Sequence, residues 1–236
     1  DYLLFQNELE LEFARENGFG RKAELIKIGN GISFEEFDRS SAIEDARDSS
    51  GSGPFRIICV ARLESVKNQQ MLLRALGLLR ERYGIEDFIC SFIGEGDPHQ
   101  YAELIAQLGL QRHVEFTGKL GRAEIAEYYA RADLNVLPSR TEGMPRALME
   151  AIYMGVPSVG TDVIGTVEVI KPGLSGELVP LDDAEALAEC IHELRQDPKR
   201  RAELSKSGVE YARQHFDENK VVQRLLDLYA SIVDSK

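Results

Sequence analysis

The 236-residue sequence has few of the residues that build disulfide frameworks or metal sites. Its three cysteines, Cys59, Cys90 and Cys190, are odd in number and show no C-x-x-C spacing. Because the first two stand in apolar, strand-like runs, we interpret the cysteines as reduced core residues of a cytosolic protein. The four histidines are scattered singly, without carboxylates or cysteines at ligand spacing. We therefore expect structural histidines and no metal site.

Long apolar runs and an excess of basic charge are also missing. No run approaches the roughly 20 residues that span a bilayer, and the start, D-Y-L-L-F-Q-N, lacks the basic flank of a secretory signal. The absence of an initiator methionine suggests a fragment or a processed chain. The formal charge of -12 argues against a nucleic-acid surface. With 43% hydrophobic residues, the chain is expected to be a soluble, cytoplasmic globular protein.

From residue 55 onward, apolar strand-like runs alternate with amphipathic helical stretches. The expected strands cover residues 55–60, 87–93, 113–117, 133–137, 156–160 and 175–179. Runs that are apolar on both faces and separated by helices predict an α/β fold, a Rossmann-like parallel sheet with helices on both faces. In such sheets ligands bind beyond the carboxyl ends of the strands, so the loops after the strands should hold the site.

The flanks of this alternation predict further parts of the chain. Residues 1–30, with a polar helix from Glu8 to Asn17, are expected to be the tail of a mostly absent N-terminal domain. Residues 31–54 would connect it to the main domain, since their second half is polar and rich in serine and glycine. The main domain would cover residues 55–215, and residues 216–236 would form a C-terminal helix with an apolar stripe.

The loop after the first of these strands carries two cations. Arg62 and Lys67 bracket the turn in V-A-R-L-E-S-V-K-N, where Ser65 or Asn68 could cap the next helix. Two cations beside a helix N-terminus, with its free N–H groups and its dipole, suit an anion such as a diphosphate. The alternative is that both are ordinary surface cations near Glu64.

The loop after the second strand has a weaker glycine motif. Gly94, Glu95 and Gly96 begin like a dinucleotide-binding turn, but His99 stands where G-x-G-x-x-G has its third glycine. A tight turn ahead of a helix capped by Asp97 explains the glycines fully.

Glu150 is a carboxylate in an apolar helical stretch, R-A-L-M-E-A-I-Y-M. Burying an unpaired carboxylate costs several kcal/mol, roughly, so a partner is required. The vicinal hydroxyls of a ribose or hexose would supply one, because a carboxylate offers two acceptor oxygens. A structural salt bridge to Arg140 or Arg146 is the alternative.

Glu142 stands in the loop before that helix, in T-E-G-M-P. Pro145 suits the first position of the helix, so Glu150 lies about 7 to 8 Å further along the axis. The two glutamates would then reach different parts of one elongated ligand. Taken alone, Glu142 could also be a loop residue in solvent.

Several motifs occur together in the order typical of one enzyme family. E-G-M-P-R-A-L-M-E, two glutamates separated by seven residues, followed by A-I-Y-M-G-V-P-S-V-G-T-D, resembles the hallmark of the retaining glycosyltransferases of family four (glycosyl transferases group one), which have the GT-B fold. The resemblance covers about residues 24–215. The accompanying motifs are G-N-G-I (29–32), A-R-L-E-S-V-K (61–67), F-I-G-E-G-D-P (92–98), V-E-F-T-G-K-L (114–120) and G-L-S-G-E-L-V-P (173–180).

The resemblance implies a role for each matching residue. Arg62 and Lys67 would hold the donor diphosphate and assist departure of the nucleotide, which makes them catalytic together with Glu142. Glu142 would face the donor sugar and Glu150 the ribose hydroxyls. The remaining contacts would come from the backbone of Gly143, Met144 and Pro145, toward sugar and phosphates, and from the backbone near Lys119 and Leu120, toward the base. V-I-G-T-V-E (163–168) departs from the paired glycines of many relatives, so Glu168 is left unassigned.

The implied function is transfer of a sugar from a nucleoside diphosphate sugar to an acceptor, with retention of anomeric configuration and without metal or other cofactor. This chain would be the donor-binding half, inactive alone. The acceptor, a glycan, lipid or small molecule, would bind through the missing N-terminal domain, toward which the final helix returns and which alone could meet a membrane. The alternatives are a GT-B isomerase acting on a nucleotide sugar and a nucleotide-sugar-binding module without catalysis.

Overall fold

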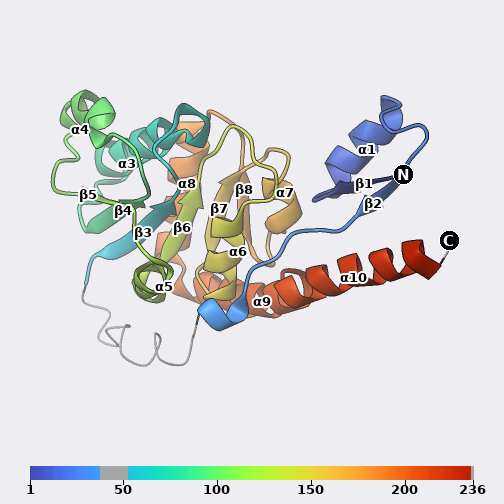
Figure 1. The fold of residues 1–236 in the computed structure, drawn as a ribbon. Coiled ribbons are helices and arrows are strands. Elements are labelled where there is room, and N and C mark those ends of the chain that lie inside the picture. Colours follow the sequence, from blue (N-terminus) through green and yellow to red (C-terminus); the bar gives the residue numbers. More distant parts are fainter. Residues whose placement is uncertain (38–52, 235–236) are drawn as a thin grey trace.

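The computed structural model describes residues 1–37 and 53–234 (Figure 1). Residues 38–52 of the connecting segment that the sequence predicts over 31–54 therefore lie outside the described residues.

A six-stranded parallel sheet forms the centre of the molecule, in the order β5-β4-β3-β6-β7-β8. Each strand overlaps one that the sequence predicts. The order reverses between β3 and β6, so the chain leaves the two strands in opposite directions. In parallel sheets of this kind, ligands bind at the carboxyl ends of the two strands at such a switch point. The strands are β3 (Phe55–Val60), β4 (Phe88–Ile93), β5 (Val114–Gly118), β6 (Leu134–Leu137), β7 (Ser158–Thr161) and β8 (Gly176–Val179).

Helices cover both faces of this sheet (Figure 1). Strand β3 shows why, because its successive side chains point to opposite faces. Ile57 and Cys59 lie in one buried cluster with helices α3 and α8, and Ile58 lies in the other with α5 and α6. The elements between the strands are η2 (Ser65–Lys67), α3 (Gln69–Tyr83), η3 (Pro98–Tyr101), α4 (Ala102–Gln107), α5 (Arg122–Arg131), α6 (Arg146–Tyr153) and α7 (Thr166–Val169), and α8 (Ala184–Gln196) and α9 (Pro198–His215) follow β8.

The N-terminal residues form a small unit of their own. Strands β1 (Tyr2–Phe5) and β2 (Glu24–Lys27) pair in parallel, and helix α1 (Glu8–Glu16) connects them. Asn7 caps that helix, since its Oδ1 accepts from the backbone N–H of Glu10 at 2.7 Å. The predicted polar helix is therefore present. Figure 1 shows this unit beside the main sheet domain rather than within it.

Residues 31–37, which the sequence places in the connecting segment, pack into the main domain. Ile32 and Phe37 are fully buried in the cluster of α5 and α6, and the short helix η1 (Phe34–Glu36) lies between them. The backbone of Ile32 also pairs with Phe216 and Glu218, at 2.9 and 3.1 Å. This stretch therefore ties the beginning of helix α10 to the core.

Helix α10 (Glu218–Asp234) extends away from the sheet on the side of the N-terminal unit (Figure 1). Arg224 donates from Nη1 to the carbonyl oxygen of Ile28 at 3.1 Å, which links the two. The helix is largely exposed. Its exposed apolar side chains are Val222, Leu226, Tyr229 and Val233.

The cysteines are free, and the first two are core residues as predicted. Cys59 and Cys90 are buried in the sheet, and Cys190 on α8 is half-buried. Burial raises the pKa of the Cys59 thiol to about 12, so this thiol stays protonated at neutral pH.

Candidate functional site

The predicted site residues lie in the loops that follow β3, β5 and β6, except Glu150, which lies on helix α6. Because the six strands are parallel, these loops lie along one edge of the sheet. The loops after β3 and β6 adjoin each other at the point where strand order reverses. The structure therefore brings Lys67 and Glu142 together.

Lys67 and Glu142 form a direct ion pair. The amino group of Lys67 donates to Oε1 of Glu142 at 2.7 Å, and the two side chains are 20% and 9% exposed. Oε1 also accepts from the hydroxyl of Ser139 at 2.6 Å. Glu142 is therefore not a loop residue in solvent, and its second oxygen, Oε2, can meet a ligand.

Arg62 is held less firmly than Lys67. Its guanidinium pairs with Glu64 at 2.7 Å, and its side chain is 65% exposed. Its backbone is fixed instead, since the buried Gln69 donates from Nε2 to the Arg62 carbonyl oxygen at 2.8 Å. In this structure Arg62 is therefore a surface cation paired with Glu64. This is the arrangement that the sequence analysis gives as the alternative to diphosphate binding.

Glu150 lies half-buried on helix α6, and neither arginine proposed as its salt-bridge partner is bound to it. Arg140 pairs with Asp182, and Arg146 lies 3.8 Å from Glu218. Burial raises the pKa of Glu150, while the charges of Arg146 and Arg122 and the hydroxyl of Tyr129 lower it in part. A carboxylate with a raised pKa and no ion pair within the described residues matches a group whose partner is a ligand.

The backbone between the two glutamates is held by Asn7 of the N-terminal unit and by Asn30, which follows that unit. Pro145 is the residue that precedes helix α6, one position before the place the sequence predicts for it. The carbonyl oxygen of Gly143 accepts from Asn7 Nδ2 at 2.9 Å, and that of Met144 accepts from Asn30 Nδ2 at 3.3 Å. The carbonyl groups of this loop are thus fixed by residues more than 100 positions earlier in the sequence.

Lys119 and Leu120 follow β5 at the far end of the same edge. Lys119 is exposed and pairs with Glu95 of the neighbouring loop at 2.6 Å, which raises the Lys119 pKa and lowers that of Glu95. The backbone N–H of Gly94 donates to the carbonyl oxygen of Gly118 at 2.9 Å. The loop after β5 therefore lies two strands away from the loop of Arg62 and Lys67, because β4 lies between β5 and β3.

The turn after β4 serves packing, as the sequence analysis concludes. Asp97 caps the following helix, since its Oδ1 accepts from the N–H of His99 at 2.9 Å. A Cβ atom on Gly94 would lie 2.1 Å from the carbonyl oxygen of Ala61. The glycine therefore lets this loop lie directly against the loop that carries Arg62.

Glu168, which the sequence analysis leaves unassigned, contacts the N-terminal unit. Its carboxylate lies 3.5 Å from the Lys27 amino group and accepts from the backbone N–H of Glu8 at 3.2 Å. Lys27 also pairs with Glu8 at 3.4 Å. Glu168 therefore joins α7 to the start of α1, beside the loop that Asn7 holds.

Gly165, in the same departing motif, gives a first prediction. Its φ is +86°, and a Cβ atom there would lie 2.4 Å from the carbonyl oxygens of Glu142 and Gly143. We expect Gly165→Ala to displace the Glu142 loop, costing about 1 to 3 kcal/mol of stability and weakening nucleotide binding. Gly84→Ala is the control, because Gly84 also has positive φ but nothing within 4 Å.

Both variants are compared by thermal unfolding and by calorimetry with nucleoside diphosphates. Gly84→Ala should lose stability and keep its affinity. If Gly165→Ala binds as tightly as Gly84→Ala, the close packing at residue 165 does not shape the site.

Four residues that the sequence analysis missed support this site: Gln69, Ser139, Thr161 and Asn7. Ser139 and Thr161 are fully buried, and Thr161 donates its hydroxyl to the Ser139 carbonyl oxygen. Ser139 could have been found, because a serine three residues before Glu142 stands in the same loop. Asn7 makes its contact across the fold and leaves no signal in sequence spacing, whereas Gln69 binds the carbonyl oxygen of Arg62 within the same turn.

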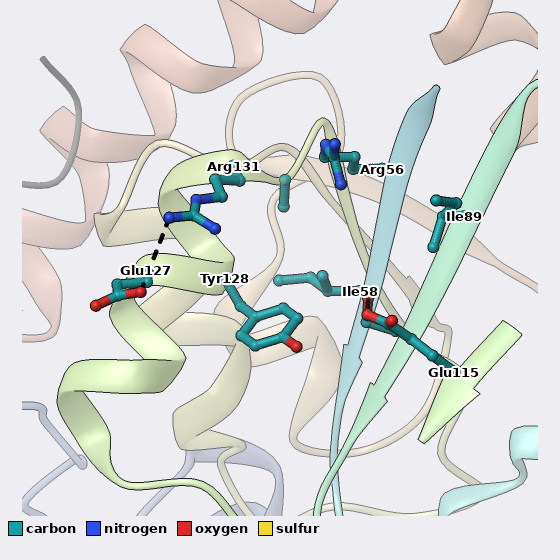
Figure 2. A pocket seen from close by; sticks show the side chains of 9 residues that line it. Arg56, Ile58, Ile89, Glu115, Glu127, Tyr128 and Arg131 are labelled. Carbon is teal, nitrogen blue, oxygen red and sulfur yellow. Dashed lines mark hydrogen bonds and ion pairs between the residues drawn. The ribbon is translucent and has the colours of Figure 1, made fainter. Parts of the chain in front are cut away.

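A cavity of about 340 Å³ lies away from these loops, between β3, β4, β5 and α5 (Figure 2). Figure 2 shows Tyr128 projecting from the helix into the space beside the strands. None of the predicted site residues lines it. The lining residues are Arg56, Ile58, Ile89, Ser91, Glu115, Glu127, Tyr128, Arg131 and Ala132.

Across residues 1–37 and 53–234, no group of three or more His, Cys, Asp and Glu side chains is placed to hold a metal ion. No helix in the same ranges has the length and apolar character to cross a membrane.

A parallel α/β sheet with charged loops at its switch point is the arrangement that nucleotide-binding domains use. Residues 42–211 match the model of the family described as "Glycosyl transferases group 1". The chain belongs to this family, which confirms the resemblance that the motifs indicate.

Similar proteins agree with that assignment. The chain is 35% identical to the amylovoran biosynthesis glycosyltransferase AmsK of Erwinia amylovora, over 82% of this chain and 49% of that protein. It is 29% identical to a GDP-mannose-dependent phosphatidylinositol monomannoside mannosyltransferase of Mycolicibacterium smegmatis, over 90% and 58%. The chain thus spans about half the length of the curated relatives it matches.

Among solved structures, HepE of Anabaena in complex with UDP and glucose superposes with a TM-score of 0.84. The sequences are 22% identical, and the match covers 98% of this chain and 63% of HepE. At this identity the likeness speaks for the fold, and it confirms the predicted α/β architecture.

Proposed function

We propose that this chain is the donor-binding part of a glycosyltransferase that takes a sugar from a nucleoside diphosphate sugar and retains its anomeric configuration. The observation that carries the proposal is the arrangement at the switch point. A lysine paired with Glu142 stands there beside a helix that carries Glu150, a carboxylate without an ion pair in the described residues. A cation for the diphosphate and two carboxylates for hydroxyl groups match the parts of such a donor.

Charge stabilisation of the leaving diphosphate is the main chemical contribution in this proposal. When the bond between the sugar and the diphosphate oxygen breaks, negative charge grows on that oxygen. Lys67 is fixed in place before the reaction by Glu142, so its positive charge needs little reorganisation to meet it. Arg62, whose exposed side chain pairs with Glu64, can turn toward the diphosphate. In this proposal these two side chains supply the positive charge in place of a metal ion.

Glu142 has a second role, toward the sugar. Its Oε1 is occupied by Lys67 and Ser139, which leaves Oε2 to accept from a sugar hydroxyl. Glu150 would accept from the ribose hydroxyls, which replace the water that burial removes. The backbone near Lys119 and Leu120 would lie against the base.

The acceptor would bind to a part of the protein that precedes this chain. β1 and β2 form a parallel sheet of only two strands, and parallel strands are rarely stable without neighbours on both sides and covered faces. Tyr2, Leu3 and Leu4 of β1 and Phe13 of α1 are exposed. These features support an N-terminal domain of which β1, α1 and β2 are one edge, and toward which the apolar side of α10 turns.

The names of the relatives favour transfer over isomerisation or simple binding. AmsK and the mannosyltransferase are both named as glycosyltransferases. HepE was solved with UDP and glucose, so a uridine diphosphate sugar is one donor to test, and the GDP-mannose dependence of the mannosyltransferase makes a guanosine diphosphate sugar another.

A thermal-shift panel tests the proposal. We expect one of uridine, guanosine and adenosine diphosphate, at about 100 times its dissociation constant, to raise the unfolding midpoint by about 5 to 10 °C. A chelator should leave that shift unchanged. The chain should transfer no sugar alone, because the acceptor side is absent.

Two results would count against this proposal. If none of the three diphosphates or their sugars shifts the midpoint, the chain does not bind a nucleotide donor. Sugar transfer by the purified 236-residue chain would show that it is more than the donor-binding part.

A further inference from the structure

Two residues near Lys67 and Glu142 have an unusual backbone conformation. Asn68 and Asp182 have φ values of +53° and +60°, and they are the non-glycine residues with positive φ in the described part of the chain. This region is unfavourable for side chains other than glycine, and it persists where surrounding contacts enforce it. The two residues come from different loops, Asn68 before α3 and Asp182 after β8.

Asn68 and Asp182 are bound to each other and to Arg140. Asn68 Nδ2 donates to Asp182 Oδ1 at 2.9 Å, and Arg140 Nη2 donates to Asn68 Oδ1 at 3.2 Å. Arg140 Nη1 donates to the other carboxylate oxygen of Asp182. Each of the three side chains therefore contacts the other two, and the amide of Asn68, which is 5% exposed, is satisfied on both sides.

Asn68 does not act as the helix cap that its position suggests. It precedes α3 as the sequence analysis expects, but its side chain makes no capping hydrogen bond. Its amide and carbonyl are used by Asp182 and Arg140 instead. The strained backbone of Asn68 therefore serves a contact between loops rather than the helix.

Arg140 binds the residues on either side of Lys67, which are Val66 and Asn68. Its backbone N–H donates to the carbonyl oxygen of Val66 at 2.8 Å, and its guanidinium binds the side chain of Asn68. In its own loop Arg140 lies between Ser139 and Thr141, two positions before Glu142. The same residue thus fixes the loop of the cation to the loop of the carboxylate that the cation contacts.

We propose that Arg140, with Asn68 and Asp182, is a positioning residue that holds Lys67 in register with Glu142 for the donor diphosphate. This inference rests on the proposed function. It assigns no contact with the donor to Arg140 itself. Loss of the bridge would let the Lys67 turn move relative to the Glu142 loop, so the amino group would no longer stand at one place.

Three variants test the bridge, with the diphosphate from the panel that binds most tightly and its bare nucleoside as the two ligands. Arg140→Ala should lower diphosphate affinity about tenfold and change nucleoside affinity less than about twofold. Arg140→Lys keeps the charge but cannot bridge two groups with a planar fork, so it should not restore affinity. Asn68→Gly keeps the left-handed backbone and removes the amide, so it should also weaken the diphosphate alone.

Arg200→Ala is the matched control. Arg200 pairs with Glu177 at 2.9 Å and is 36% exposed, so its removal deletes the same charge and a comparable ion pair elsewhere. Affinities are measured by calorimetry, and thermal unfolding checks that each variant is folded. Arg200→Ala should bind both ligands as wild type does.

The possible results distinguish failure of the Arg140 bridge from failure of the proposed function. If wild type binds a diphosphate and Arg140→Ala or Asn68→Gly binds it equally well, the bridge is overturned and the donor site stands. If Arg140→Lys restores full affinity, Arg140 acts through its charge, which also overturns the positioning role. If wild type binds no diphosphate at all, both the inference and the proposed function fall.

Discussion

With Lys67 replaced by alanine, the affinity for nucleoside diphosphate is expected to fall about 100-fold, or about 2.7 kcal/mol. In the proposed site the variant would lose a charge-assisted hydrogen bond to the diphosphate. It also leaves the carboxylate of Glu142, which is 9% exposed, without its cation and facing an anion. Affinity for the bare nucleoside should change less than about twofold, since no phosphate is involved. Calorimetry with both ligands gives the difference.

Arg62→Ala should act in the same direction and less strongly. Arg62 is 65% exposed and already pairs with Glu64, so solvent screens its charge more than that of Lys67. Wild-type affinity for the diphosphate should fall as salt rises. Arg131→Ala removes an exposed arginine beside the other cavity and should leave binding unchanged. If Lys67→Ala binds the diphosphate as wild type does, the lysine only neutralises Glu142.

The sheet could be predicted from the sequence because its strands are apolar on both faces. F-R-I-I-C-V places Ile57 and Cys59 against one layer of helices and Ile58 against the other. That local pattern requires a covered parallel sheet whatever the rest of the chain does. That Lys67 and Glu142 lie along one edge of the sheet also follows from the α/β prediction, since loops at carboxyl ends share that edge. Their contact depends in addition on β3 and β6 being neighbours, which the structure shows.

The contacts that hold the site could not be predicted in the same way. Asn7 binds the carbonyl oxygen of Gly143, 136 positions away, and Asn68 binds Asp182, 114 positions away. Such hydrogen bonds depend on which strands are neighbours and on how loops bend. An asparagine before a helix suggests a cap, and Asn7 is one, whereas Asn68 is not. Local spacing is the same in both cases, and the tertiary partner decides.

For Glu150, burial could be predicted from the sequence, but its neighbours in the fold could not. Its apolar neighbours predict burial, and the structure places it half-buried with a raised pKa. The two arginines near it in sequence were reasonable partners, but the fold gives Arg140 to Asp182 and turns Arg146 toward Glu218. Elimination of those partners required the structure. The assignment of Glu150 to a ribose stays a prediction. The variant Glu150→Gln tests it through both ligand binding and stability.

Glu150→Gln should weaken nucleoside diphosphate and nucleotide sugar alike, by about 1.5 to 3 kcal/mol, because a charge-assisted acceptor is lost. With a 2′,3′-dideoxy ligand the substitution should have little effect, since the hydroxyls that it would bind are gone. Glu142→Gln is the matched control. It keeps Glu150, and the amide oxygen of glutamine can still accept from Lys67 and Ser139. It should therefore leave diphosphate affinity close to that of wild type, while it lowers turnover in the whole enzyme.

The same Glu150→Gln variant should be more stable than wild type without ligand at pH 7. Burial raises the folded-state pKa of Glu150 above its ordinary value of 4.5, so the folded chain binds a proton more tightly than the unfolded chain. Its stability therefore falls as pH rises from 4.5 through the folded-state pKa, and glutamine removes that loss. The gain in unfolding midpoint should shrink as pH is lowered toward 4.5. A midpoint lowered at pH 7, with both affinities unchanged, would instead make Glu150 part of the structure and not of the donor site.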